Sequence, residues 1–173
     1  MSPENIQQKI EEYLPIRSEF KDKFGEVFTP PELIYEMLNK LEEIDPKIYK
    51  NPNLKWLDPA NGIGNFPMIA YIKLMDGLKS NIPDKKKRSE HIIKNMLYMV
   101  ELNEDNILIS KRIFGKHANI FCGSFLPEKD EVNPKWVGYF KDKLSGKIID
   151  KFDIIMGNPP FNKGKEGTQG GSR

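Results

Sequence analysis

Two short motifs, far apart in the chain, carry groups that could do chemistry together. The first reads Asp-Pro-Ala-Asn-Gly-Ile-Gly-Asn-Phe at residues 58–66, and the second reads Asn-Pro-Pro-Phe at residues 158–161. The two glycines of the first motif have no Cβ, so a turn there can take positive φ and approach a bulky ligand closely. The second motif offers an amide oxygen, a prolyl carbonyl on a rigid backbone and an aromatic ring, which suit a planar base with an exocyclic amino group. We therefore expect the two motifs to serve one reaction.

Each motif follows a hydrophobic run that predicts a β-strand. Strands are expected at residues 54–57, 96–100, 118–122 and 152–156. Apolar residues at helical spacing predict helices at residues 2–15, 29–41, 66–74 and 103–113. Because strands alternate with helices, the pattern predicts an α/β fold with a parallel sheet and right-handed crossovers.

Several segments between these elements have a more local interpretation. Thr29 is followed three residues later by Glu32, which predicts a capping box at the start of a helix. The basic block at residues 83–88 contains a proline and is expected to be a solvated loop, with contact to nucleic acid as the less favoured interpretation. Residues 136–144 are expected to be irregular or partly helical, and residues 164–173 are low in complexity.

Composition limits the classes of protein that fit. A chain of 173 residues is long enough for one domain with a real core. The 27 basic and 25 acidic residues give a net charge of only +2, so charge alone does not identify a polyanion partner. The single cysteine, Cys122, excludes an internal disulfide framework, and no Cys/His cluster has metal-ligand spacing, so no metal is expected. No apolar run is long enough for a membrane span and the polar start does not resemble a signal peptide, so we expect a cytoplasmic location without membrane contact.

Three polar side chains fall just beyond the ends of predicted strands, namely Asp58, Glu101 and Asn158. In an open parallel sheet, ligands bind outside the carboxyl ends of the strands, so these side chains are expected to converge on one edge. A carboxylate at the position of Glu101 can accept both hydroxyls of a ribose. The alternative is that Glu101 only caps the next helix, although Asn103 also offers such a cap.

At this point the chain resembles the S-adenosylmethionine-dependent DNA adenine-N6 methyltransferases of the restriction-modification type, in the gamma subgroup, whose methionine-binding segment precedes the glycine motif. The resemblance rests on residues 26–32, on residues 58–66, on Glu101 and on residues 157–161, which follow the family's order. It implies a Rossmann-like methyltransferase fold, a parallel sheet with helices on both faces, here incomplete. It also implies three segments. These are an amino-terminal helical segment at residues 1–23, a partial S-adenosylmethionine-binding methyltransferase domain at residues 24–163, and a flexible tail at residues 164–173.

The resemblance implies a role for each matching residue. Asp58 would approach the methionine ammonium of the cofactor, and Glu101 would take the ribose hydroxyls. The methionine end and the neighbourhood of the sulfonium would be lined by Phe28, Thr29, Pro30, Ala60, Gly62 and Gly64. Methyl transfer to the amino group of a flipped adenine would take place at Asn158, Pro159, Pro160 and Phe161. Two carbonyl acceptors there would stabilise positive charge as it develops on the amino nitrogen.

One segment departs from the family pattern. Similar enzymes place a Gly-Asp pair after the third strand, and its carboxylate accepts from the adenine amino group of the cofactor. Here the segment reads Gly123-Ser124-Phe125, so the resemblance leaves cofactor adenine recognition to the Ser124 hydroxyl and a backbone N–H near Phe125. Because a charge-assisted hydrogen bond is about twice as strong as a neutral one, we expect weaker cofactor binding.

The resemblance also bears on partners. Full family members continue with more strands and a DNA-recognition domain, whereas this chain has twelve residues after Phe161. We expect the DNA partner to be engaged through a recognition domain outside this chain, and the sheet edge to be covered by a further segment or a second chain. Two alternatives stay open: a methyltransferase acting on protein glutamine or an RNA base, and a non-catalytic cofactor-binding or interaction module.

Overall fold

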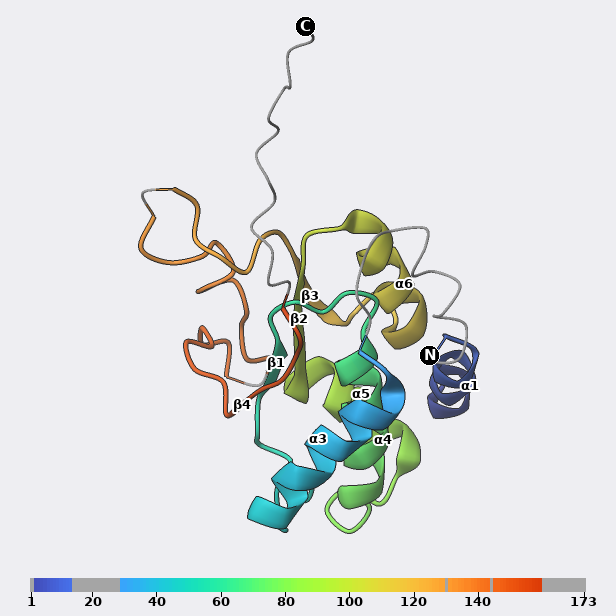
Figure 1. The fold of residues 1–173 in the computed structure, drawn as a ribbon. Coiled ribbons are helices and arrows are strands. Elements are labelled where there is room, and N and C mark those ends of the chain that lie inside the picture. The colour runs from blue at the N-terminus through green and yellow to red at the C-terminus, as the bar shows by residue number, and fades with distance from the viewer. Residues whose placement is uncertain (1, 14–28, 130, 144, 160–173) are drawn as a thin grey trace, which may run out of the picture.

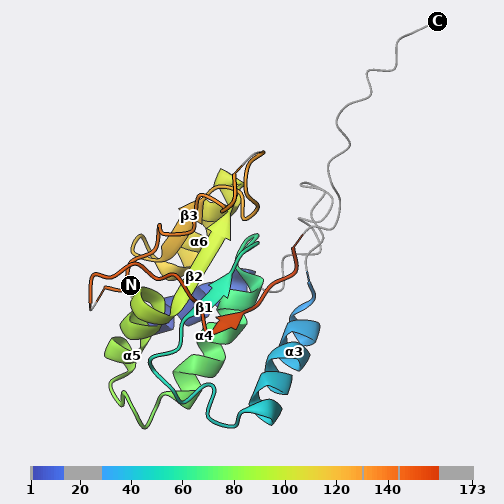
Figure 2. The same cartoon turned by 90° about the vertical axis from the view of Figure 1, so that its left-hand side faces the viewer.

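A four-stranded parallel sheet lies at the centre of the computed structural model, which describes residues 2–13, 29–129, 131–143 and 145–159. The strands are β1 (Trp56–Asp58), β2 (Leu97–Glu101), β3 (Asn119–Cys122) and β4 (Ile154–Ile155). Their order across the sheet is β3-β2-β1-β4, and Figure 2 shows them side by side. The predicted α/β class and the four predicted strands are confirmed, and β4 is shorter than expected.

The described helices lie together on one side of the sheet (Figure 1). They are α1 (Pro3–Tyr13), α3 (Pro31–Ile44), α4 (Asn65–Gly77), α5 (Lys85–His91), the π-helical turn η1 (Ile92–Met96) and α6 (Glu104–Phe114). One buried cluster joins α1, α3, α4, η1 and α6 to Trp56, Leu97 and Met99 of the strands. α4 lies between β1 and β2 in the chain, and α6 lies between β2 and β3. These three strands follow one another in the same direction across the sheet. Right-handed crossovers therefore place both helices on the same face.

The opposite face of the sheet is covered by the long connection between β3 and β4, residues 125–152, which we call the aromatic connection. Leu57, Tyr98 and Val100 of the strands pack there against Phe140 and Ile149. The expected helices on both faces are therefore found on one face only, within the described residues. The prediction of an irregular segment at 136–144 is confirmed, since its described residues form turns and one isolated bridge between Lys141 and Ile148.

An ion pair fixes the aromatic connection to the start of β1. Lys55 Nζ lies 2.9 Å from a carboxylate oxygen of Asp142 and also donates to the carbonyl of Asn95 at 2.8 Å. The hydrogen bond from Lys55 lowers the pKa of Asp142 below its usual range. The Lys55–Asp142 ion pair thus holds the aromatic connection against the start of β1, although this segment has little regular secondary structure.

The basic block at residues 83–88 is not the loop that its composition predicts. Asp84 caps α5 by accepting from the Lys87 N–H at 2.7 Å, and a capped first turn compensates for the repulsion between neighbouring lysines. Arg88 is 5% exposed and its Nη1 donates to the carbonyls of Ile82 and Pro83. Arg88 therefore serves the local fold and does not lie on an open basic surface.

Within the part of the chain that the structure describes, no helix has the length and hydrophobicity to cross a membrane.

The last residue of α4 provides a test of the packing. A Cβ built on Gly77 would lie 2.4 Å from the backbone oxygen of Tyr49. Tyr49 cannot easily move, because its ring stacks on that of Trp56, with 5.3 Å between the ring centroids. Its hydroxyl also donates to the Leu38 carbonyl at 2.7 Å. Gly77→Ala should lower the free energy of unfolding by roughly 1–3 kcal/mol through overpacking, although alanine is the better helix former.

Urea unfolding followed by circular dichroism measures this change. Ser80→Ala, at an exposed position just beyond the same helix, is the control and should shift the midpoint little. A Gly77→Ala variant that is as stable as the wild type, or more stable, would contradict the close contact.

Candidate active site

The two motifs meet at the point where the strand order of the sheet reverses. β1 has β2 on one side and β4 on the other, so the ends of β1 and β4 flank this switch point. A Cβ built on Gly157 would lie 2.7 Å from Asp58 Oδ1, which shows how closely the chain after β4 packs on the first motif. Asp58 and Asn158 are therefore at the same edge of the sheet, as the strand-end pattern predicts.

The glycine turn after β1 is held by backbone hydrogen bonds. The Asn61 N–H donates to the Val100 carbonyl at 2.9 Å, and the Gly64 N–H donates to the Asn61 carbonyl at 2.9 Å. Gly62 and Gly64 have φ values of 54° and 94°, which side-chain-bearing residues rarely adopt. Among the described residues, apart from Gly62 and its two chain neighbours, no atom lies within 4 Å of a Cβ built on Gly62, so this side of the turn has room for a ligand.

Glu101 joins the end of β2 to this turn. Its Oε2 accepts from the Gly62 N–H at 2.6 Å, and its Oε1 accepts from the Asn103 N–H at 2.8 Å. The cap of α6 is Asn103, whose side chain accepts from the Asp105 N–H at 3.0 Å. Glu101 is thus not needed as a helix cap, and its carboxylate faces the glycine turn.

Asp58 is a buried carboxyl group with one unused oxygen. The residue is 1% exposed, Oδ1 accepts from the Ala60 N–H at 3.0 Å, and Oδ2 has no hydrogen-bond partner among the described residues. Burial raises the pKa of Asp58 to about 8, the Ala60 N–H opposes the rise, and the negative charge of Glu101 adds to it. A cation placed at Oδ2 would satisfy this oxygen and favour the ionised form.

Thr29 does not form the predicted capping box. The residue before α3 is Pro30, and no side chain caps the helix. The Thr29 hydroxyl instead accepts from Asn158 Nδ2 at 3.1 Å, and the Thr29 carbonyl accepts from Asn65 Nδ2 at 3.1 Å. Tertiary hydrogen bonds replace the local one, so Thr29 links the starts of α3 and α4 to the chain after β4.

The other residues predicted for the site lie after β4, after β3 or outside the described residues. Asn158 is exposed and hydrogen-bonded to Thr29, and Pro159 is half-buried. Phe28, Pro160 and Phe161 lie outside the described residues. Beyond β3, Ser124 Oγ accepts from the Leu126 N–H at 3.0 Å, and the Phe125 carbonyl accepts from Trp136 Nε1 at 3.0 Å.

A backbone bond connects that last segment to the rest of the site. The Gly123 N–H donates to the Glu101 carbonyl at 2.9 Å, so the Ser124 segment begins beside the end of β2. The ends of β1, β2, β3 and β4 therefore contribute to one continuous edge.

Asn65 belongs to this site although the sequence patterns did not single it out. It is 6% exposed and its Oδ1 has no hydrogen-bond partner among the described residues. The available signal was a polar amide at the first position of a largely apolar helix, directly after Gly64. A polar group there is costly unless it is bonded, which marks the position as one with a specific partner.

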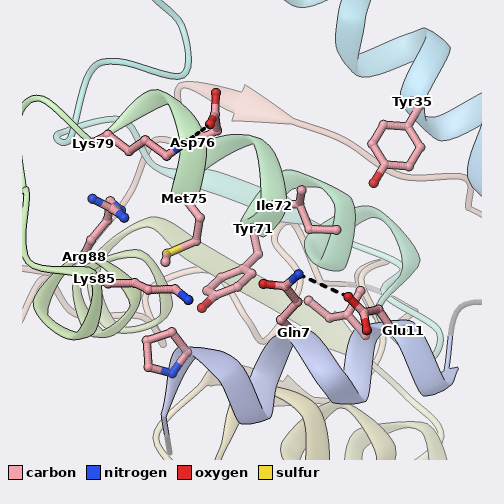
Figure 3. A pocket seen from close by; sticks show the side chains of 12 residues that line it. Gln7, Glu11, Tyr35, Tyr71, Ile72, Met75, Asp76, Lys79, Lys85 and Arg88 are labelled. Carbon is pink, nitrogen blue, oxygen red and sulfur yellow. Dashed lines mark hydrogen bonds and ion pairs between the residues drawn. The ribbon is translucent and has the colours of Figure 1, made fainter.

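A separate cavity of about 430 Å³ lies between α1, α3, α4 and α5 (Figure 3). Its polar side chains are largely paired with one another, as Gln7 is with Glu11 at 3.1 Å and Lys79 is with Asp76. Lys85, at its edge, pairs with Glu4 at 2.8 Å. None of the residues predicted to do chemistry lines this cavity, so the candidate active site is the sheet edge.

Comparisons with known proteins identify the family of the chain. The family model described as N-6 DNA Methylase matches residues 10–170. A curated protein of Mycoplasma pneumoniae (strain ATCC 29342 / M129 / Subtype 1), named as an uncharacterized adenine-specific methylase, is 38% identical over 196 residues. This match covers 79% of the present chain and 46% of the relative, so the chain spans about half the length of that relative.

A solved structure shows the same fold. It is the crystal structure of a modification subunit of a putative type I restriction enzyme from Vibrio vulnificus YJ016. The likeness has a TM-score of 0.53 at 20% identity and covers 94% of the present chain and 30% of that chain.

The raised pKa of Asp58 predicts a pH dependence of stability. Its folded pKa of about 8 lies above the ordinary value of 3.8, so the folded chain binds more protons than the unfolded chain between these values. The contribution of Asp58 to stability is therefore present at low pH and is lost as the pH rises from about 4 to about 8, by up to about 1.4 kcal/mol per pH unit. Asp58→Asn should remove this slope, as measured by urea unfolding at a series of pH values.

Asp150→Asn, at an exposed carboxyl group, is the matched control and should leave the slope in place. Equal slopes in the wild type and in Asp58→Asn would show that the Asp58 carboxyl group is not neutral in the folded protein at mid-range pH.

Proposed function

We propose that this chain, which belongs to the N-6 DNA methylase family, carries the cofactor-binding half of an enzyme that transfers a methyl group from S-adenosylmethionine to the exocyclic amino group of adenine in DNA. The observation that supports this most directly is the packing of Gly157 against Asp58, which brings the glycine turn and Asn158 to one edge. Two substrates, one at each motif, would then face each other across that edge.

The residues present fit such a cofactor. The unpartnered buried Oδ2 of Asp58 suits the methionine ammonium, and the Glu101 carboxylate at the glycine turn suits ribose hydroxyls. The open space beside Gly62 leaves room for a ligand close to the backbone. Phe28, Thr29, Pro30, Ala60 and Gly64 would line the methionine end, and Ser124 and Phe125 would face the adenine. When bound, S-adenosylmethionine supplies an electrophilic methyl group on a sulfonium.

The residues after β4 would hold the target base. The amino nitrogen of adenine is a poor nucleophile because its lone pair is delocalised into the ring. Asn158 Oδ1 and the Pro159 carbonyl would each accept one amino hydrogen, which orients the lone pair and stabilises positive charge as it develops on nitrogen. Phe161, after Pro160, would stack on the base once it has left the duplex.

The partners of the whole protein are part of the same proposal. The curated relative and the solved neighbour are both longer than the matched region, which supports DNA recognition through parts beyond these residues. The neighbour is a modification subunit, so we propose a restriction-modification role in the cytoplasm. Base-edge contacts, which specify a DNA sequence, would come from those further parts.

Transfer of label from S-adenosylmethionine tests the function. The protein is incubated with the labelled cofactor and separately with DNA, RNA and protein, and label is expected on adenine N6 in DNA. Asn158→Ala should lower kcat at least about 100-fold through loss of one charge-stabilising acceptor, with cofactor affinity nearly unchanged. Asn53→Ala, at an exposed asparagine before β1, is the control. Label in RNA or protein but not in DNA would overturn the proposed substrate.

The Ser124 segment gives a second prediction. Ser124→Asp would place a carboxylate where the Ser124 hydroxyl now accepts from the Leu126 N–H, and it should tighten cofactor binding about threefold to tenfold through a charge-assisted bond. Calorimetry with S-adenosylhomocysteine measures the affinity. Ser124→Ala is the control and should not tighten binding. If Ser124→Asp gives no gain, the adenine of the cofactor is not bound beside this segment.

A further inference from the structure

We propose that Thr29 is a positioning residue that orients the carboxamide of Asn158, so that the amide oxygen faces the target base. This inference rests on the proposed function, because it assigns Thr29 a part in holding the acceptor that the methylated amine needs. It gives the Thr29 side chain a task distinct from lining the cofactor.

The contact that carries the proposal joins two residues that are 129 positions apart in the chain. Asn158 Nδ2 donates to Thr29 Oγ1 at 3.1 Å. Within the described residues, Asn158 Oδ1 makes no hydrogen bond. The nitrogen end of the amide is therefore held by the protein and the oxygen end is left for another donor.

The orientation matters because the two ends of a carboxamide have opposite hydrogen-bonding character. The oxygen accepts and the nitrogen donates, and a rotation of the amide by half a turn exchanges them. An exocyclic amino group brings hydrogens, so only the oxygen can bind it. The hydrogen bond from Nδ2 to the Thr29 hydroxyl holds the amide in the arrangement that leaves its oxygen for the amino group.

Thr29 is itself held firmly enough to act in this way. It is 9% exposed, and its carbonyl accepts from the buried Asn65 side chain at 3.1 Å. Pro30 and Pro31 follow directly, and their rings restrict the backbone at the start of α3. The branched Thr29 side chain has few χ1 rotamers, and its hydroxyl is not used to cap the helix.

A purely structural role makes a different prediction from a positioning role. If Thr29 only stabilised the junction, its loss would lower stability and affect binding and turnover together. If it orients Asn158, loss of the hydroxyl changes the environment of the Asn158 amide and lowers turnover, whereas cofactor affinity stays nearly constant.

Nuclear magnetic resonance of the ¹⁵N-labelled chain tests the contact without any need for activity. Asn158→Ala identifies the side-chain amide signals of Asn158 by their disappearance. In Thr29→Val, which keeps the shape but lacks the hydroxyl, these signals should shift and their protons should exchange faster with water. In Thr29→Ser they should stay close to the wild-type positions. Unchanged signals in Thr29→Val would overturn the proposal.

Kinetics test the consequence of the contact. In Thr29→Val, kcat for methyl transfer to adenine should fall about tenfold to hundredfold, because a misplaced acceptor loses the reacting geometry. The dissociation constant for S-adenosylhomocysteine should change less than about threefold, and Thr29→Ser should restore most of kcat. Equal losses in the valine and serine variants, or no loss in Thr29→Val, would overturn the positioning role.

The results for the wild-type protein and for Thr29→Val separate the role of Thr29 from the proposed function. A wild-type protein that methylates adenine together with an unimpaired Thr29→Val variant refutes the inference alone. A wild-type protein that labels only RNA or protein refutes the proposed substrate, and with it the role of Thr29 toward adenine.

Discussion

The geometry of the site depends on a buried carboxyl group packed against a residue without a side chain. Asp58 ends the central strand β1, and the backbone at Gly157 passes so close that a Cβ would lie 2.7 Å from its Oδ1. Only glycine leaves room for this approach, so the neighbouring strand can deliver Asn158 to the same edge. The burial that accompanies this contact also withdraws Asp58 from water, raises its pKa and leaves its Oδ2 without a hydrogen-bond partner among the described residues.

A second constraint keeps the glycine turn in shape before any ligand binds. Glu101 receives N–H groups from Gly62 and Asn103, so the ends of β1 and β2 and the start of α6 share one carboxylate. A carboxylate that accepts backbone N–H groups lowers the cost of a turn with positive φ, because the exposed amides of that turn are satisfied. Binding energy is then not spent on ordering the turn.

Much of this arrangement could be predicted from the sequence, because strand ends and glycine turns are local patterns. The convergence of Asp58, Glu101 and Asn158 followed from their strand-end positions alone. Two errors have different causes, which are a tertiary partner at Thr29 and local hydrogen bonds at the lysine-rich block. Thr29 has the spacing of a capping box, yet its hydroxyl bonds to Asn158. The lysine-rich block forms a helix because Asp84 caps it and Arg88 donates to the carbonyls of Ile82 and Pro83. The partner of Asn65 could not be predicted, because Thr29 is distant in sequence, although the polar amide at the start of an apolar helix was a signal.

The unequal cover of the two sheet faces has a consequence for local unfolding. One face is closed by helices with continuous backbone hydrogen bonding, whereas the aromatic connection is held mainly by ring contacts, such as those of Tyr98 with Phe140 and Phe152, and by the Lys55–Asp142 pair. We expect such a segment to open at a lower free energy than the helical layer. Because Ser124 and Phe125 lead into this segment, the edge beyond β3 would lose its native shape before Asp58 and Glu101 do. Under the proposed function, the part of the edge assigned to the adenine of the cofactor would then open before the part assigned to its methionine.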